Sequence, residues 1–215
     1  MKMEDRKSKI ENKRYGIIVV GTSQGGFHAL KTLLTGLPSG FPLPVVLVQH
    51  RDENAGDTLG LLLQESSVLP VKEVDDKEEI LSGRIYLAPS GYHLLIEGDH
   101  FALSTEAPVW YARPSIDILF ESAAEAYGDK VIGVVLTGAN EDGAQGLAAI
   151  KKRCGLAVVQ DPKTAESPRM PEAAIAATTV DKILQLEEIG PFLKDYVENN
   201  FLKFSQPSFV KKRRK

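Results

Sequence analysis

Three scarcities in the sequence exclude whole classes of protein. A single cysteine, Cys154, allows no internal disulfide and fits a reducing cytoplasm. No apolar run approaches the ~20 residues that a membrane span needs. The first 14 residues are charged and hold no apolar segment typical of a secretory signal. We therefore expect a cytoplasmic protein.

Histidine is also scarce, and charge is unevenly distributed. Four scattered histidines and one cysteine offer no metal-ligand spacing, so we expect neither a metal nor another cofactor. Residues 1–14 carry a net charge of +3 and residues 203–215 carry +6, so the formal net charge of −3 leaves −12 on residues 15–202. An acidic body repels phosphates, so we expect no nucleic-acid partner. The basic tail is typical of a solubilising end, with weak contact to an anionic membrane or acidic surface as the alternative.

Apolar patterning predicts one α/β domain. Continuous apolar runs at 17–20 and 131–136 are typical of strands buried on both faces of a parallel sheet. Further strands are expected at 45–49, 71–74, 85–88, 93–97, 100–104 and 156–160. Helices are expected at 27–37, 58–65, 116–127, 172–177 and 187–201, and one more follows Gly146 and ends at Arg153. Ser115 is expected to cap the third helix and Gly128 to end it, and Gly98-Asp99 is a hairpin turn.

This order predicts a doubly wound, mostly parallel β-sheet with helices on both faces and an antiparallel hairpin. We expect a disordered charged leader at 1–14, a catalytic domain at 15–202 and a basic tail at 203–215, in a monomer.

The turn Gly21-Thr-Ser-Gln-Gly25 joins the first strand to the first helix and has Ser23 at its centre. The helix aims free N–H groups and its positive dipole end at this turn, which favours a nucleophilic serine beside an oxyanion site. A dinucleotide site is disfavoured because the glycine spacing is not G-x-G-x-x-G. An α/β-hydrolase matches G-x-S-x-G, but there the serine follows a mid-chain strand.

A serine hydrolase of another chain order needs a base and an orienting acid. His50 ends a buried strand consecutive with that of Ser23, and His93 is the alternative base; His28 and His100 are expected to be structural or exposed. Asp142 follows the strand at 131–136, although it is also a plausible N-cap of the next helix. Asp117 and Asp161 are less suitable acids.

Several segments together resemble the CheB family of chemoreceptor protein-glutamate methylesterases, over about residues 15–190 and in its catalytic domain only. They are Gly21–Gly26, Val48–His50, Ile85–Pro89, Tyr92–Leu95, Arg113–Asp117, Leu136–Gly138, Asp142–Ala144, Val159–Asp161 and Met170-Pro171. The resemblance implies a Ser23, His50 and Asp142 triad that hydrolyses glutamate γ-methyl esters on a chemoreceptor. It also implies an oxyanion site at the backbone of Gln24 and Ala139, and a substrate cleft near Gly25, Arg113, Pro114, Ser115 and Met170.

Two features depart from the family pattern. Gly138-Ala-Asn140 stands where the family usually has Gly-Met-Gly, and the 14 residues before the first strand are too few for the phospho-receiver domain that family members commonly carry. Two alternatives therefore stay open. One is a non-catalytic module that binds a receptor or another partner, and the other is a serine esterase or glutamine deamidase with another substrate.

Overall fold

The computed structural model describes residues 16–52 and 58–205. The expected leader, and the tail beyond its first three residues, lie outside these ranges.

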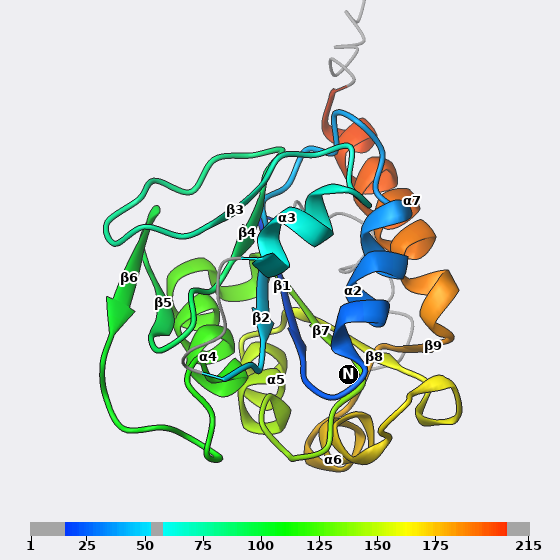
Figure 1. The fold of residues 1–215 in the computed structure, drawn as a ribbon. Helices are drawn as coiled ribbons and strands as arrows, with labels where there is room; N and C mark the ends of the chain where they lie inside the picture. The colour runs from blue at the N-terminus through cyan, green and yellow to red at the C-terminus, as the bar shows by residue number, and fades with distance from the viewer. Residues whose placement is uncertain (1–15, 53–57, 206–215) are drawn as a thin grey trace, which may run out of the picture.

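Seven parallel strands form the central sheet, in the order β3-β4-β2-β1-β7-β8-β9 (Figure 1). Their bounds are β1 Ile17–Thr22, β2 Val45–Gln49, β3 Val71–Glu73, β4 Ile85–Leu87, β7 Val131–Val135, β8 Leu156–Gln160 and β9 Lys182–Leu184. A separate antiparallel hairpin pairs β5 (His93–Glu97) with β6 (His100–Ser104). The expected fold class is confirmed, and every paired strand of the large sheet is parallel.

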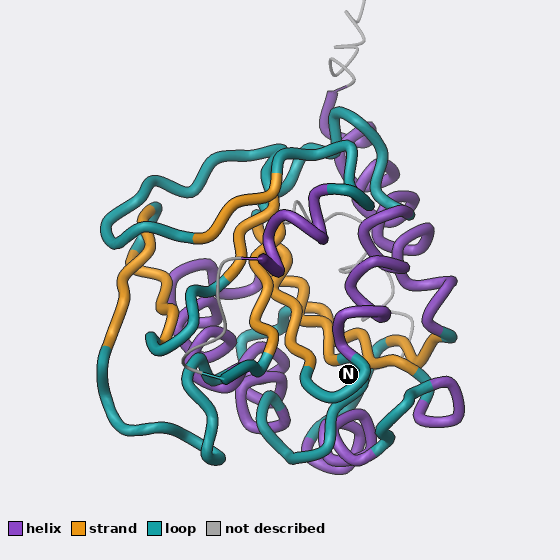
Figure 2. The backbone as a smooth tube through the Cα atoms, viewed as in Figure 1, coloured by secondary structure: helices purple, strands orange, loops and turns teal. Residues whose placement is uncertain are grey.

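Helices cover both faces of this sheet, which gives three layers (Figures 1 and 2). One face carries α2 (Gly26–Thr35), α3 (Thr58–Gln64) and α7 (Leu186–Ser205), and the other carries α4 (Ile116–Tyr127), α5 (Ala144–Lys152), α6 (Arg169–Ala177) and the hairpin. Successive residues of β1 serve opposite faces: Ile18 and Val20 pack on the α2 side, and Ile17 and Val19 on the α4 side. This alternation is why the strand is apolar throughout.

The predicted bounds hold best where a cap marks them. Helix α4 has its expected range, Ser115 accepts a hydrogen bond from the Ile118 N–H, and Gly128 ends the helix with φ 60°. Short 3₁₀ helices at Gly128–Lys130 and Pro162–Thr164 were not predicted. Strand β9 was not predicted either, and α6 begins three residues earlier than expected.

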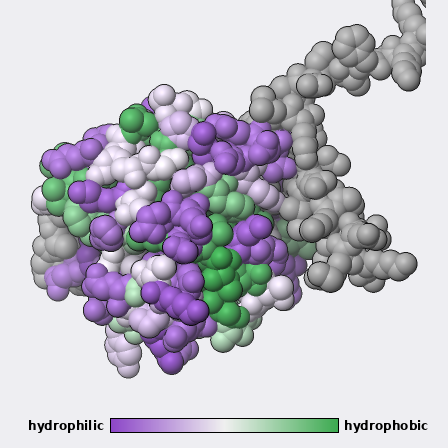
Figure 3. All heavy atoms as spheres, turned by 90° about the vertical axis from the view of Figure 1, so that its right-hand side faces the viewer, coloured by the Kyte–Doolittle hydropathy of each residue, from purple (hydrophilic) through white to green (hydrophobic). Residues whose placement is uncertain are grey.

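The surface is largely polar on the face that carries α7 and β9. Figure 3 shows a narrow strip of hydrophobic side chains between hydrophilic ones near the lower centre of this face, and smaller hydrophobic groups toward its upper left. Within the described ranges, no helix is long and apolar enough to cross a membrane.

The chain winds in both directions from β1. Strand β2 pairs with one edge of β1 and β7 with the other, so the loops after β1, β2 and β7 leave the sheet side by side. Such a switch in strand order opens a crevice at the carboxyl ends of the strands. Ser23, His50 and Asp142 all lie in these three loops.

Candidate active site

Ser23 lies half-buried in the turn between β1 and α2. Its N–H donates to the Thr137 carbonyl (2.9 Å), and its own carbonyl accepts from the Gly26 N–H (2.9 Å). Gly25 has φ 77°, a left-handed conformation that costs glycine least. The turn therefore enters α2 immediately after the serine, with the N-terminus of the helix beside it.

His50 is the neighbour of Ser23 across the sheet. Thr22 is paired in register with Gln49, and the His50 N–H donates to the Thr22 carbonyl (3.1 Å). Since neighbouring parallel strands lie about 4.8 Å apart, the residues that follow this pair start from adjacent backbone positions.

Gln49 ties these two residues together. Its side-chain Nε2 donates to the carbonyl oxygen of Ser23 and to that of His50, each at 2.8 Å. Both partners only accept, so the orientation of the amide follows from its contacts. From the sequence, Gln49 was noted only as part of the motif Val48–His50. A polar side chain in an otherwise apolar buried strand was the signal that could have indicated its role.

Asp142 holds the ring of His50. The Nε2 atom of His50 is 2.7 Å from Oδ2 of Asp142, whose residue is completely buried. Since a carboxylate accepts, Nε2 carries the proton of this bond, and Nδ1 is the ring nitrogen that remains for another partner.

The same carboxylate caps the N-terminus of α4. It accepts the Ser115 hydroxyl (2.9 Å), the Ile116 N–H (2.7 Å) and the Asp117 N–H (2.9 Å). Asp142 therefore does not cap α5, the helix that follows it, whose N-cap is Gly143. The alternative that we considered from the sequence, a cap of the next helix, is wrong.

These contacts determine the charge of Asp142. Burial alone would raise its pKa, but the hydrogen bond and charge of His50, with the N–H groups of Ile116 and Asp117, hold the pKa below its ordinary value. A buried, ionised carboxylate fixes the imidazole and stabilises it when it is protonated.

Asp117, in the first turn of α4, caps the N-terminus of α5 in return. Its Oδ1 accepts the N–H groups of Gly143 (2.9 Å) and Gly146 (2.7 Å) at the start of α5. Burial raises the pKa of Asp117 to about 6, and the nearby charge of Asp142 adds to this effect. The hydrogen bond from the Gly146 N–H acts in the opposite direction but is weaker than burial. Two helices thus exchange caps through two neighbouring carboxylates.

Thr137 joins the loops that carry Ser23 and Ala139. Its hydroxyl donates to the Gln24 carbonyl (2.9 Å) and accepts the Ser167 N–H (2.8 Å). Gln24 and Ala139 are both exposed, and their N–H groups donate to no residue within the described ranges. Two unengaged donors therefore lie in loops that Thr137 fixes together.

The expected cleft residues separate into two groups, and Pro114 is buried beside Ser115. Arg113 lines an open hollow of about 470 Å³ beside His50, and its guanidinium donates to the carbonyls of Thr105 and Glu106. Gly25 lies under the side chain of Glu166, with no room for a Cβ. Ser115 and Met170 are completely buried and present no surface to a substrate. Ser115 supports Asp142 from behind, and Met170 packs beneath Gly138.

His93, the alternative base, is a structural residue. It is completely buried; Nδ1 accepts the Ser115 N–H (3.1 Å) and Nε2 donates to the Ala107 carbonyl (3.1 Å). Both ring nitrogens are thereby engaged, which fixes a neutral tautomer. His28 and His100 are exposed, as expected.

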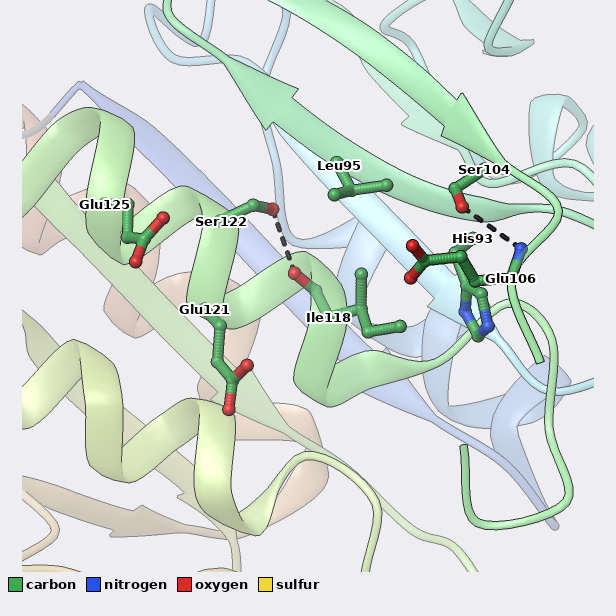
Figure 4. Close-up of a pocket in the computed structure, with 8 residues that line it drawn as sticks. All are labelled: His93, Leu95, Ser104, Glu106, Ile118, Glu121, Ser122 and Glu125. Carbon is green, nitrogen blue, oxygen red and sulfur yellow. Dashed lines mark hydrogen bonds between the residues drawn. The ribbon is translucent and has the colours of Figure 1, made fainter. Parts of the chain in front are cut away.

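A second hollow of about 230 Å³ is lined by residues of α4, of the β5–β6 hairpin and of the loop after it, His93 among them (Figure 4). Glu121 and Glu125 extend from α4 along this hollow, and Glu106 faces them from the loop after β6. Burial and the charges of Glu125 and Asp142 raise the pKa of Glu121. No group of three or more histidine, cysteine or acidic side chains suited to a metal occurs in the part of the chain that the structure describes.

Comparison with known proteins identifies the family. The family model of the CheB methylesterase matches residues 18–193, most of the chain. This chain belongs to the CheB methylesterase family. The resemblance inferred from the sequence motifs is thereby confirmed.

Individual relatives agree with this membership. A protein of Leptospira interrogans, provisionally named protein-glutamate methylesterase/protein-glutamine glutaminase, is 51% identical over 187 residues, covering 86% of this chain and 97% of the relative. A protein-glutamate methylesterase/protein-glutamine glutaminase 2 of Anaeromyxobacter dehalogenans is 40% identical, and this chain spans only 53% of it. The crystal structure of the CheB methylesterase catalytic domain of Thermotoga maritima matches with a TM-score of 0.81 at 32% identity, over 86% of this chain and 99% of that one.

Proposed function

We propose that this chain hydrolyses glutamate γ-methyl esters of a chemoreceptor protein to glutamate and methanol, with Ser23 as nucleophile, His50 as base and Asp142 as orienting acid. The observation that carries the proposal is the 2.7 Å contact of His50 with the buried carboxylate of Asp142. His50 and Ser23 directly follow paired positions of the neighbouring strands β2 and β1. The names of the relatives support the substrate class, because they describe esterases that act on protein glutamate.

The reaction begins with proton transfer from Ser23. Nδ1 of His50 takes the hydroxyl proton while Oγ attacks the ester carbonyl, and Asp142 stabilises the imidazolium through Nε2. The tetrahedral oxyanion accepts hydrogen bonds from the N–H groups of Gln24 and Ala139; one such donor typically contributes about 3 kcal/mol to the barrier reduction. The ring nitrogens have exchanged the roles that they have in chymotrypsin-like enzymes, where Nδ1 faces the aspartate.

Collapse of the tetrahedral intermediate breaks the bond to the methoxy group. The His50 proton passes to this leaving group, methanol departs, and an acyl-enzyme on Ser23 remains. His50 then removes a proton from water, which attacks the acyl carbonyl and releases glutamate. The same sequence with ammonia as leaving group deamidates glutamine, and the second half of the relatives' names favours this as a second activity.

Labelling with a fluorophosphonate serine probe tests the triad. We expect one label per wild-type chain, none in Ser23→Ala or His50→Ala, and labelling slowed by a factor on the order of 10⁴ in Asp142→Asn. Ser39→Ala is the matched control, because Ser39 is exposed in the connection that leads from α2 to the amino end of β2, whereas the site lies at the carboxyl ends of the strands. Labelling that survives in Ser23→Ala would contradict the assignment. A folded wild type that takes no label would favour the non-catalytic binding module.

A further inference from the structure

Trp110 and Tyr111 occupy a turn that disfavours them. The Val109 N–H donates to the Ala112 carbonyl (3.1 Å) and the Ala112 N–H to the Val109 carbonyl (2.9 Å), which closes a two-residue hairpin loop. Both loop residues are left-handed, with φ 50° at Trp110 and 60° at Tyr111. Two consecutive positive φ values define the type I′ turn, where Asn-Gly is strongly preferred and large side chains strain the backbone.

Burial does not compensate for this strain. Tyr111 is fully exposed, and Trp110, the only tryptophan of the chain, is 46% exposed. We call these two residues the aromatic tip. Backbone strain that packing does not explain is characteristic of functional sites.

The aromatic tip lies at the mouth of the candidate active site. It lines the hollow of about 470 Å³ together with His50 and Asn140. The side chain of Asn140 donates to the Trp110 carbonyl (3.4 Å), which connects the tip to the loop that carries Ala139. The hollow is also lined by Arg51, Asp52 and Arg113; Arg51 is paired with Glu73 and its side chain is only 8% exposed, so the positive and negative charges of this region balance.

We propose that the aromatic tip is a docking site for an amphipathic helix of the protein substrate, which lies across the hollow and extends its esterified glutamate toward Ser23. The proposal rests on the proposed function. A helix with side chains is 10–12 Å in diameter, so the ester side chain enters the hollow while the helix stays on its rim. Tryptophan and tyrosine supply large contact areas with a polar end, which makes them frequent anchors of protein interfaces.

The chemistry of the rim favours such a helix over a membrane surface, where tryptophan and tyrosine also gather. The hollow behind the tip is lined by His50 and by polar loop residues, Asp52 and Asn140 among them. A membrane that received the tip would cover the base.

Intrinsic fluorescence tests the contact without any substitution in the aromatic tip, because Trp110 is the only tryptophan. A tryptophan-free synthetic receptor helix with one glutamate methyl ester is titrated into Ser23→Ala, which binds without turnover. We expect a saturable blue shift of the emission. An emission spectrum that stays unchanged while the helix binds, as measured by anisotropy of a labelled helix, would overturn the proposal.

Trp110→Asn/Tyr111→Gly then separates recognition from chemistry, since it installs the preferred turn residues. We expect an equal or higher melting temperature and a drop of about tenfold in the ratio of kcat/KM on the helix to kcat/KM on a capped tripeptide ester. Val68→Asn, which removes an exposed apolar side chain near the amino end of β3, should leave the ratio unchanged. An unchanged ratio in the tip variant, with or without lost binding to anionic vesicles, would overturn the docking role.

Failure of the proposed function gives a different result. If the wild type releases methanol from neither ester, the esterase assignment fails, and the anisotropy titration with the tip variant still decides the docking question. A tenfold weaker helix affinity in that variant would support the docking site alone, and an equal affinity would overturn it.

Discussion

At the residue scale, two aspartates of one site shift their pKa values in opposite directions. Asp142 has four hydrogen-bond donors, including His50, that keep it ionised. Asp117 has two backbone donors and the charge of Asp142 beside it, and burial dominates. This difference indicates that the carboxylate of Asp142 supports the base, His50, and that the carboxylate of Asp117 supports the start of α5.

Asp117→Asn removes a charge and keeps an oxygen for Gly143 and Gly146. The pKa of Asp117, about 6, lies above the ordinary value of 3.8, so the native state binds its proton more tightly than the unfolded chain does. The stability that Asp117 contributes is therefore complete below pH 4 and is lost as the pH rises through 6. We expect the variant to gain on the order of 1 kcal/mol at pH 7 and nothing at pH 3.5.

Urea unfolding of both proteins at several pH values measures this gain. A variant that is less stable than the wild type at pH 7 and equal to it at pH 3.5 would show that the ionised carboxylate is a net stabilising cap, contrary to our account.

Gln49→Glu tests the clamp on Ser23 and His50. At neutral pH the new carboxylate has no proton to donate to either carbonyl, so we expect kcat/KM to fall by about 10²-fold through misplacement of the catalytic pair. Protonation restores one donor, so the ratio of variant to wild-type kcat/KM should rise as the pH is lowered toward 5. A ratio that does not vary with pH would mean that the amide acts only through packing.

Residue types at strand ends were sufficient to select Ser23, His50 and Asp142 as candidates. The cap that Ser115 provides was predicted, but its bond to Asp142 and the roles of Gln49 and Asp117 were not, because each depends on a contact between residues 26 or more positions apart. Met170 and Ser115 were expected at the cleft, yet both are buried behind it. A motif shows that a residue belongs to a site, and not whether it faces the substrate.

At the element scale, the first residue of α4 sets the position of the acid. A Cβ at Gly21 would lie 2.2 Å from Cγ2 of Ile116, and one at Gly143 would lie 2.7 Å from the same atom. Ile116 is thus seated between β1 and the loop after β7, which directs its N–H to Asp142.

Gly21→Ala should therefore destabilise the protein and displace the N-terminus of α4 from Asp142. We expect a loss of about 1–3 kcal/mol in unfolding free energy, since the added methyl overpacks a rigid contact, together with reduced esterase activity. Gly60→Ala is the control: nothing lies within 4 Å of a Cβ there, and alanine favours α3 by about 0.5–1 kcal/mol. Calorimetry of the two variants compares them, and equal melting temperatures would contradict the seating of Ile116.

Elements with strong periodicity or caps were predicted well, and short edge elements were not. Strand β9 has three residues, Ile183 among them is 49% exposed, and no alternation can develop over that length. Helix α6 starts at Arg169 because Pro171 is tolerated in the first helical turn, whereas a helix was expected only from residue 172 onward.

At the scale of the whole molecule, the sheet order explains why three distant loops meet. In doubly wound sheets, sites form at the carboxyl ends of the strands, and the reversal of strand order at β1 brings the loops of β1, β2 and β7 together there. The full strand order was not predictable from the sequence, because buried strands of similar apolar composition do not specify which strands they pair with.

Methanol release from a methylated chemoreceptor tests the central claim most directly. The account predicts that the wild type releases methanol and that Ser23→Ala, folded to the same extent, is slower by a factor on the order of 10⁴–10⁶. Methanol release by Ser23→Ala at the wild-type rate would contradict the assigned nucleophile. A wild type that takes the serine probe but releases no methanol would contradict the assigned ester.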